Sequence, residues 1–135
     1  MFNILRPLIF KFSPEVAHSL AIKALKLNNI PYTKPKDNRI LETNFCEKKL
    51  PSPIGVAAGF DKNAEVYNPL FNLGFGFVEV GTITPKPQFG NPKPRVFRLE
   101  EDEALINRLG FNNSGSDEIS TVSYTHLRAH ETLIY

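Results

Sequence analysis

Lys62 and Thr82 are the residues whose positions most favour ligand chemistry in this chain. Lys62 follows the apolar segment 54–59, and Thr82 follows a second apolar segment, 75–81. If both segments are parallel strands, their carboxyl ends meet at one edge of a sheet, where α/β proteins bind ligands. Glycine lets a flat ligand approach the backbone, lysine offers a positive charge and threonine a hydroxyl group. The pattern favours an anionic or phosphate-bearing ligand, and a solvated lysine beside a strand-end turn fits it equally well.

Asn107 and His18 are two further candidates, each with two readings. The amide of Asn107 presents one acceptor and two donors, so it can pair with both the C=O and the N–H of a cyclic imide or amide. Residues 107–112 (NRLGFN) also have the composition of an ordinary turn. His18 lies on the polar edge of a predicted helix, where a histidine is usually solvated. On a helix that lies on a membrane, it could instead contact a quinone head group.

Two short amphipathic helices are predicted at the N-terminus. Residues 1–12 carry apolar side chains at near-helical spacing, with basic residues between them. Ser13, Pro14 and Glu15 then supply an N-cap, a proline in the first turn and an acid in the first turn, and an apolar stripe follows over residues 16–27. Such a hairpin cannot bury both of its apolar faces in itself. It must lie on a larger domain, a partner or a membrane surface.

A strand, a helix and a second strand are predicted further along the chain. Segments 54–59 and 75–81 are apolar without alternation, which is typical of buried parallel strands. A helix over residues 64–73, ended by a glycine, separates them. Because proline breaks a helix interior, the regular helix could instead begin with Asn68 as the cap and Pro69 as the first residue. The order is that of a βαβ unit.

The remaining segments are predicted to be largely irregular. Residues 28–53 read as a proline-punctuated linker with one short strand pair around residues 40–45 and Lys49. Residues 84–98 hold four prolines and predict a long, stiff, non-helical loop of the kind that is usually functional. Residues 100–108 predict a weak turn of helix, and a glycine- and asparagine-rich turn follows.

Composition excludes several classes of protein. The chain has 135 residues, is 41% hydrophobic with eleven Phe, and carries a formal net charge of +2. These values argue against disorder, and the absence of a basic block argues against a nucleic-acid partner. A single cysteine, Cys46, excludes a disulfide scaffold and is expected to be a bystander. We find no signal peptide and no apolar run near the ~18 residues of a membrane-spanning helix, so a cytoplasmic protein is the default expectation.

Four segments, in order and spacing, resemble the first barrel segments of dihydroorotate dehydrogenase. They read SPIGVAAGFDK at 52–62, GFGFVEVGT at 74–82, PKPQ, GNP and PRVFRL within 85–99, and INRLGFN at 106–112. The resemblance implies an α/β fold, the N-terminal part of a (β/α)₈ TIM barrel preceded by a small amphipathic helical hairpin. It divides the chain into a membrane-associating hairpin at 1–30, a linker at 31–52 and the first part of an FMN-binding barrel at 53–119.

The N-terminal hairpin resembles that of the quinone-dependent, membrane-associated class 2 enzymes. Membership of that class implies FMN-dependent oxidation of (S)-dihydroorotate to orotate in pyrimidine (UMP) biosynthesis, with ubiquinone or menaquinone as electron acceptor. It also implies a peripheral membrane protein on the cytoplasmic side of the inner membrane. No metal site is implied.

The resemblance also implies roles for individual residues. The FMN would be lined by Ala58, Gly59, Phe60, Asp61, Lys62 and Thr82. The substrate would meet Lys62 together with Asn107, Arg108, Leu109, Gly110 and Phe111. The quinone tunnel would include His18 and Arg98. The catalytic base is not among these residues and is expected to lie beyond residue 135.

The resemblance covers residues 1–119, and a complete barrel needs about 250 residues. We therefore expect a fragment that is inactive alone. Residues 122–132 resemble a translated sequencing adapter, so residues 120–135 are expected to be an artefactual tail. Within it, His126 and His130 followed by Glu131 mimic a helical metal pair.

Two other functions remain open at this stage. One is a non-catalytic, membrane-associated module that binds a flavin or a phosphate. The other is a different flavin barrel, such as a dihydropyrimidine or dihydrouridine oxidoreductase, against which the N-terminal hairpin and residues 85–99 argue.

Overall fold

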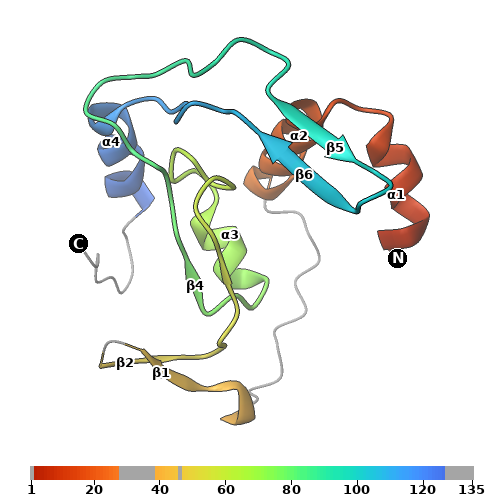
Figure 1. Cartoon of the computed structure of the whole chain (residues 1–135). Helices are drawn as coiled ribbons and strands as arrows, with labels where there is room; N and C mark the ends of the chain where they lie inside the picture. Colours follow the sequence, from red (N-terminus) through yellow and green to blue (C-terminus); the bar gives the residue numbers. More distant parts are fainter. Residues whose placement is uncertain (1, 28–38, 46, 127–135) are drawn as a thin grey trace.

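The computed structural model describes residues 2–27, 39–45 and 47–126 (Figure 1). Residues 31–38 of the predicted linker, the predicted bystander Cys46 and the last nine residues of the predicted tail, including His130 and Glu131, lie outside the described residues. None of the helices described is both long and apolar enough to cross a membrane.

The two predicted N-terminal helices are present as α1 (Phe2–Phe10) and α2 (Pro14–Lys26). Ser13 caps α2, because its Oγ accepts a hydrogen bond from the backbone N–H of Val16 over 3.4 Å, and Pro14 occupies the first turn. Several large apolar side chains of this pair and its corner remain exposed. They are Leu5, Leu8, Ile9, Phe12, Val16 and Leu20.

The predicted strand pair in the linker is also present. After the short 3₁₀ helix η1 (Arg39–Leu41), β1 (Thr43–Phe45) pairs antiparallel with β2 (Lys48–Leu50). Glu47, between the strands, has a φ of 62°. The chain then enters the central unit through Ser52, which is buried.

The βαβ unit consists of β3 (Gly55–Val56), α3 (Tyr67–Asn72) and β4 (Phe77–Val78), and β3 and β4 pair in parallel with Gly55 opposite Phe77. Helix α3 begins earlier than the alternative start at Asn68, because Val66 is its N-cap and Pro69 lies within its first turn. A proline is tolerated there, since first-turn N–H groups have no partner inside the helix. Gly74, with a φ of 96°, ends the helix as predicted.

The core lies between α2 and α3. Ile22 and Leu25 of α2 pack with Val66 and Leu70, and four partly buried side chains surround them, namely Val56, Phe60, Phe75 and Val78. Helix α2 is therefore packed on the βαβ unit, so the apolar stripe predicted for it does bury against a larger body.

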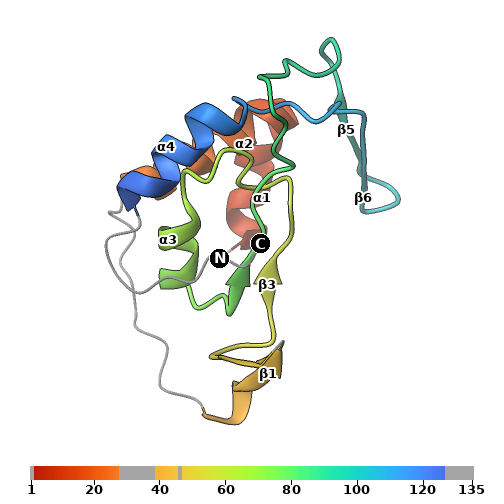
Figure 2. The same cartoon turned by 90° about the vertical axis from the view of Figure 1, so that its left-hand side faces the viewer.

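Residues 96–107 correct two expectations. The end of the predicted loop is strand β5 (Val96–Leu99), and the predicted turn of helix over 100–108 is wrong, because β6 (Ala104–Asn107) pairs antiparallel with β5. The cluster of acids at 100–103 forms the turn between them, where Glu103 has a φ of 50°. Figures 1 and 2 show this β-hairpin standing apart from the β3–β4 pair.

The last described element is α4 (Ser116–His126), which starts within the predicted barrel segment and continues into the predicted tail. Its Ile119 is buried. The turn-rich segment before it is confirmed, with positive φ at Gly110, Phe111 and Gly115. Asn113, in that segment, forms an isolated β-bridge with Gln88.

Candidate functional site

The loops that follow β3 and β4 are hydrogen-bonded to each other. The N–H of Gly59 donates to the carbonyl oxygen of Gly81 over 2.9 Å, and the N–H of Gly81 donates to that of Asp61 over 3.0 Å. The two strand ends expected to meet therefore do meet. The Asp61 side chain is only 1% exposed, and its two carboxylate oxygens accept the N–H groups of Glu65 and Val66. The buried carboxylate of Asp61 thus holds the backbone of this loop in place.

Gly59 leaves the surface of this loop open. Its φ is 101°, and a Cβ added there would meet no atom within 4 Å. A positive φ of this size strains other L-residues. The open face allows a planar group to lie directly against the backbone, so the loop fits a flavin ring.

Lys62 is the positively charged group nearest to this open face in the sequence, and it is half-buried. Burial lowers the pKa of its ammonium group; Arg95 lowers it further, while Glu15 raises it. Lys62 lines a broad, open cavity of about 1220 Å³. Seven of the predicted site residues line this cavity: His18, Gly59, Phe60, Lys62, Arg98, Asn107 and Leu109.

The other predicted site residues do not line the cavity among the residues described. They are Ala58, Asp61, Thr82, Arg108, Gly110 and Phe111. The side chains of Thr82 and Phe111 are exposed, and that of Asp61 is turned into the core. The structure thus brings together residues of the first loop, helix α2 and the β5–β6 hairpin, and leaves Thr82, in the loop directly after β4, outside the cavity.

His18 is not a solvated histidine. Its Nε2 lies 2.7 Å from the carbonyl oxygen of Phe60, and its ring meets the Phe60 ring edge to face at 5.4 Å. Because a carbonyl oxygen only accepts hydrogen bonds, Nε2 must carry the hydrogen. Nδ1 of the neutral ring is then an acceptor. Helix α2 is thereby joined to the loop that carries Gly59 and Lys62.

Arg98 joins β5 to the corner between α1 and α2. Its Nη1 donates to the carbonyl oxygens of Phe12 and Phe10 over 2.8 and 3.4 Å. Its guanidinium also lies 4.4 Å from the centre of the Phe10 ring, and the guanidinium of Arg6 lies 5.0 Å from it. His18 and Arg98 therefore both stand where the helix pair meets the rest of the chain.

Three residues that line the cavity were missed by sequence reasoning. The first two are Arg95, which is buried, and Glu15, with which it forms an ion pair. The third is Asn112. Asn112 has a buried Oδ1 that accepts no hydrogen bond within the described part of the chain. A lone arginine in a proline-rich loop and an asparagine in a turn carry no pattern that marks them. An unsatisfied acceptor in a cavity wall fits an N–H donor of a ligand.

A family model described as "Dihydroorotate dehydrogenase" matches residues 40–133. Among curated relatives, the "Dihydroorotate dehydrogenase (quinone)" of Erythrobacter litoralis is 54% identical over 117 residues, which are 87% of this chain and 34% of the relative. That of Bartonella henselae is 58% identical over 110 residues, 82% of this chain and 30% of the relative.

Solved structures give the same result. The ligand-free DHODH of Eimeria tenella has a TM-score of 0.80 and 46% identity, covering 90% of this chain and 34% of that one. Its complex with ferulenol has a TM-score of 0.77, also at 46% identity, covering 85% of this chain and 32% of that one.

The chain spans about a third of the length of the curated relatives it matches. These relatives imply an α/β TIM-barrel enzyme fold, and the part of the chain described here contains one parallel strand pair and no closed barrel. On the extent of the family match, which covers more than half of the sequence, the chain belongs to the dihydroorotate dehydrogenase family.

Proposed function

We propose that this chain forms part of an enzyme that oxidises (S)-dihydroorotate to orotate with FMN and passes the electrons to a quinone. The observation that carries the proposal is that Gly59, Lys62 and Asn107 line one cavity. A backbone open to a flat ring, a cation and an amide are the groups needed to hold a flavin beside an anionic pyrimidine. The family membership and the names of the relatives support the same reaction.

The loop of Ala58, Gly59, Phe60, Asp61 and Lys62, with Thr82 beside it, is assigned to FMN. Gly59 admits the ring, and the inward-facing carboxylate of Asp61 holds the loop in shape. When bound, FMN supplies the two-electron redox chemistry that no protein side chain provides. The ammonium group of Lys62 favours negative charge in its vicinity.

The substrate is assigned to Lys62 and to the segment Asn107, Arg108, Leu109, Gly110 and Phe111. The ammonium group of Lys62 attracts the carboxylate of dihydroorotate, and the Asn107 amide pairs with a C=O and an N–H of the pyrimidine ring. These contacts orient the ring in the cavity. The base that removes the C5 proton is assigned to no residue of this chain.

The quinone is assigned to the boundary between the helix pair and the remainder of the chain, at His18 and Arg98. With Nε2 bonded to Phe60, Nδ1 of His18 is an acceptor when the ring carries one hydrogen, whereas Arg98 is a donor. The exposed apolar side chains of α1 and α2 support peripheral attachment to a membrane. We place this attachment on the cytoplasmic side of the inner membrane. Ubiquinone and menaquinone are the acceptor classes.

The proposal is tested in a chimera in which this chain replaces the matching third of the Erythrobacter litoralis relative. We expect dihydroorotate-dependent reduction of a short-chain ubiquinone, and a loss of at least about 100-fold in kcat/KM for Lys62→Ala. Lys86→Ala, an exposed lysine outside the cavity, is the matched control and should retain activity. A folded chimera that binds FMN but does not oxidise dihydroorotate would overturn the proposal.

A further inference from the structure

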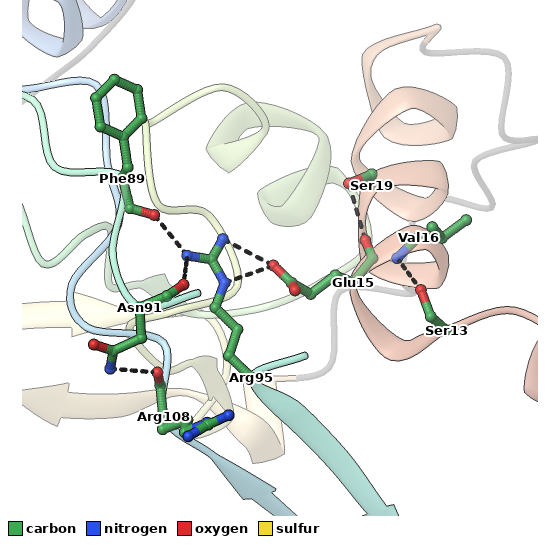
Figure 3. A network of polar contacts seen from close by, with 8 residues as sticks. All are labelled: Ser13, Glu15, Val16, Ser19, Phe89, Asn91, Arg95 and Arg108. Carbon is green, nitrogen blue, oxygen red and sulfur yellow. Dashed lines mark hydrogen bonds and ion pairs between the residues drawn. The ribbon is translucent and has the colours of Figure 1, made fainter. Parts of the chain in front are cut away.

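Arg95 is the most extensively bonded charged side chain at the cavity. It is only 6% exposed. Its Nε and Nη2 lie 3.0 and 2.9 Å from Oε1 of Glu15 in α2, and its Nη1 donates to the carbonyl oxygens of Phe89 and Asn91 over 2.6 and 3.1 Å (Figure 3). A planar guanidinium can make these contacts at once because its donors form a fixed fork.

The same network continues into the segment assigned to the substrate. The N–H of Arg108 donates to the carbonyl oxygen of Arg95 over 2.8 Å. Asn91 donates twice, from Nδ2 to the carbonyl oxygen of Arg108 over 2.7 Å and from its N–H to that of Leu109 over 3.0 Å (Figure 3). A continuous set of hydrogen bonds therefore leads from Glu15 on α2, through Arg95 and Asn91, to residues 108–109.

Close backbone contacts leave little freedom in this network. A Cβ at Gly90 would lie 2.2 Å from the carbonyl oxygen of Leu109 and 2.7 Å from Nη1 of Arg95. A Cβ at Gly110 would lie 2.9 Å from the backbone nitrogen of Asn91. Because the loop at 89–91 and the segment at 108–110 touch without intervening side chains, a shift in one must move the other.

We propose that Arg95 is a positioning residue, which ties the seating of helix α2 to the placement of residues 107–109 in the cavity. Arg95 would act through Asn91 and the segment backbone rather than by touching the substrate. This inference rests on the proposed function in assigning the substrate to that segment. The influence of Arg95 and Glu15 on the pKa of Lys62 agrees with their position at the same cavity.

The hydrogen-bond network is tested first without any substrate, by residue-resolved hydrogen exchange on the 135-residue chain. Glu15→Gln removes the counter-charge of a buried guanidinium while keeping the side-chain shape. We expect exchange of the Asn91 and Arg108 amides to accelerate at least tenfold. Glu15→Asp, which keeps the charge with a shorter reach, should give a smaller acceleration and replaces Glu15→Gln if that variant does not fold.

The matched control removes a different ion pair of the same helix. Lys26 of α2 forms an ion pair with Glu65, which lies outside the Arg95 network. Glu65→Gln should leave exchange of the Asn91 and Arg108 amides unchanged. The inference is overturned if these amides are unprotected in the unsubstituted chain or if Glu15→Gln leaves their exchange unchanged. It is also overturned if Glu15→Gln and Glu65→Gln accelerate their exchange equally.

Kinetics in the chimera then separate positioning from a merely stabilising role. Glu15→Gln should raise the KM for dihydroorotate about three- to tenfold with a smaller change in kcat. Arg95→Met should also raise this KM, and Arg95→Lys should raise it less. An equal fall in kcat for every variant, with KM unchanged, would overturn the assignment. If the unsubstituted chimera does not oxidise dihydroorotate, the proposed function fails, while the exchange result still decides whether the network exists.

Discussion

The backbone N–H of Val66 donates to Oδ2 of Asp61 over 2.8 Å, and these two side chains are 0% and 1% exposed. A carboxylate is thus held in the core beside an aliphatic side chain. It is accommodated there because both oxygens accept backbone N–H groups, the second from Glu65. The loop that carries Lys62 is consequently built around a buried acid.

Replacing Asp61 should therefore destabilise the chain strongly. Asp61→Ala leaves two N–H groups without their acceptors, each costing about 1–3 kcal/mol, so we expect a loss of about 2–5 kcal/mol in the free energy of unfolding. Asp61→Asn keeps one acceptor and should lose about half as much. Urea denaturation measures both. Asp102→Ala, at an exposed turn, should change stability by less than about 0.5 kcal/mol, and an equal effect of all three would contradict the explanation.

His18→Ala should cost about 1 kcal/mol, since it removes the hydrogen bond to the Phe60 carbonyl oxygen and the edge-to-face ring contact. Ser19→Ala is the neighbouring control, because Ser19 is exposed and, among the described residues, its side chain bonds only within the helix, to the carbonyl oxygen of Glu15. Its effect should stay within about 0.5 kcal/mol. Denaturant unfolding of the two variants decides the point, and a His18→Ala chain as stable as the parent would refute it.

The lowered pKa of Lys62 predicts how its contribution to stability depends on pH. Its pKa in the folded chain lies below the ordinary value of 10.5, chiefly because of burial. Between the two pKa values, the unfolded chain binds more protons than the folded chain, so stability rises with pH. Below the pKa of the folded chain, Lys62 is protonated in both states, and burial of its ammonium group lowers the stability of the folded chain by the full amount.

Lys62→Met removes this cost and serves as the comparison. We expect the variant to gain most over the parent near neutral pH, and the gap to narrow as the pH approaches 10.5. Paired urea titrations at a series of pH values give the difference, in which the other titrating groups cancel. A gap that is constant with pH would mean that Lys62 is not perturbed in the folded chain.

Gly76 and Gly59 should separate stability from flavin binding. A Cβ at Gly76 would lie 1.9 Å from the carbonyl oxygen of Ser52, so Gly76→Ala should cost about 1–3 kcal/mol through forced backbone movement. Gly59→Ala meets no atom and strains only its φ of 101°, at a cost of about 1–2 kcal/mol.

The two glycine variants should differ clearly in FMN affinity. A methyl group at Gly59 occupies the open face assigned to the flavin ring, so Gly59→Ala should weaken FMN binding at least tenfold and more than Gly76→Ala does. Flavin fluorescence titration of the two variants tests this. Equal affinities would remove Gly59 from the flavin site.

Local patterns predicted the local features of this fold. Ser13 and Pro14 mark the start of α2 because capping depends on residues within one turn. The partnership of β5 with β6 was missed because four prolines and a run of acids dominate the composition there, whereas strand pairing depends on side chains from two segments. Lys62 and Asn107 were predicted as site residues from their types, and both line the cavity, whereas Arg95 and Glu15 were not predicted. Those two residues are 80 positions apart, and nothing local marks their contact.

Helix α2 is held at three separate places, by Glu15 to Arg95, by His18 to Phe60 and by Lys26 to Glu65. Because these contacts reach three different segments of the chain, a tilt or roll of the helix would break at least one of them. If the exposed apolar side chains of α1 and α2 rest on a bilayer, the lipid surface fixes the angle of the whole domain. The opening of the cavity would then stand at one set height above the lipid, without a separate anchor to set it.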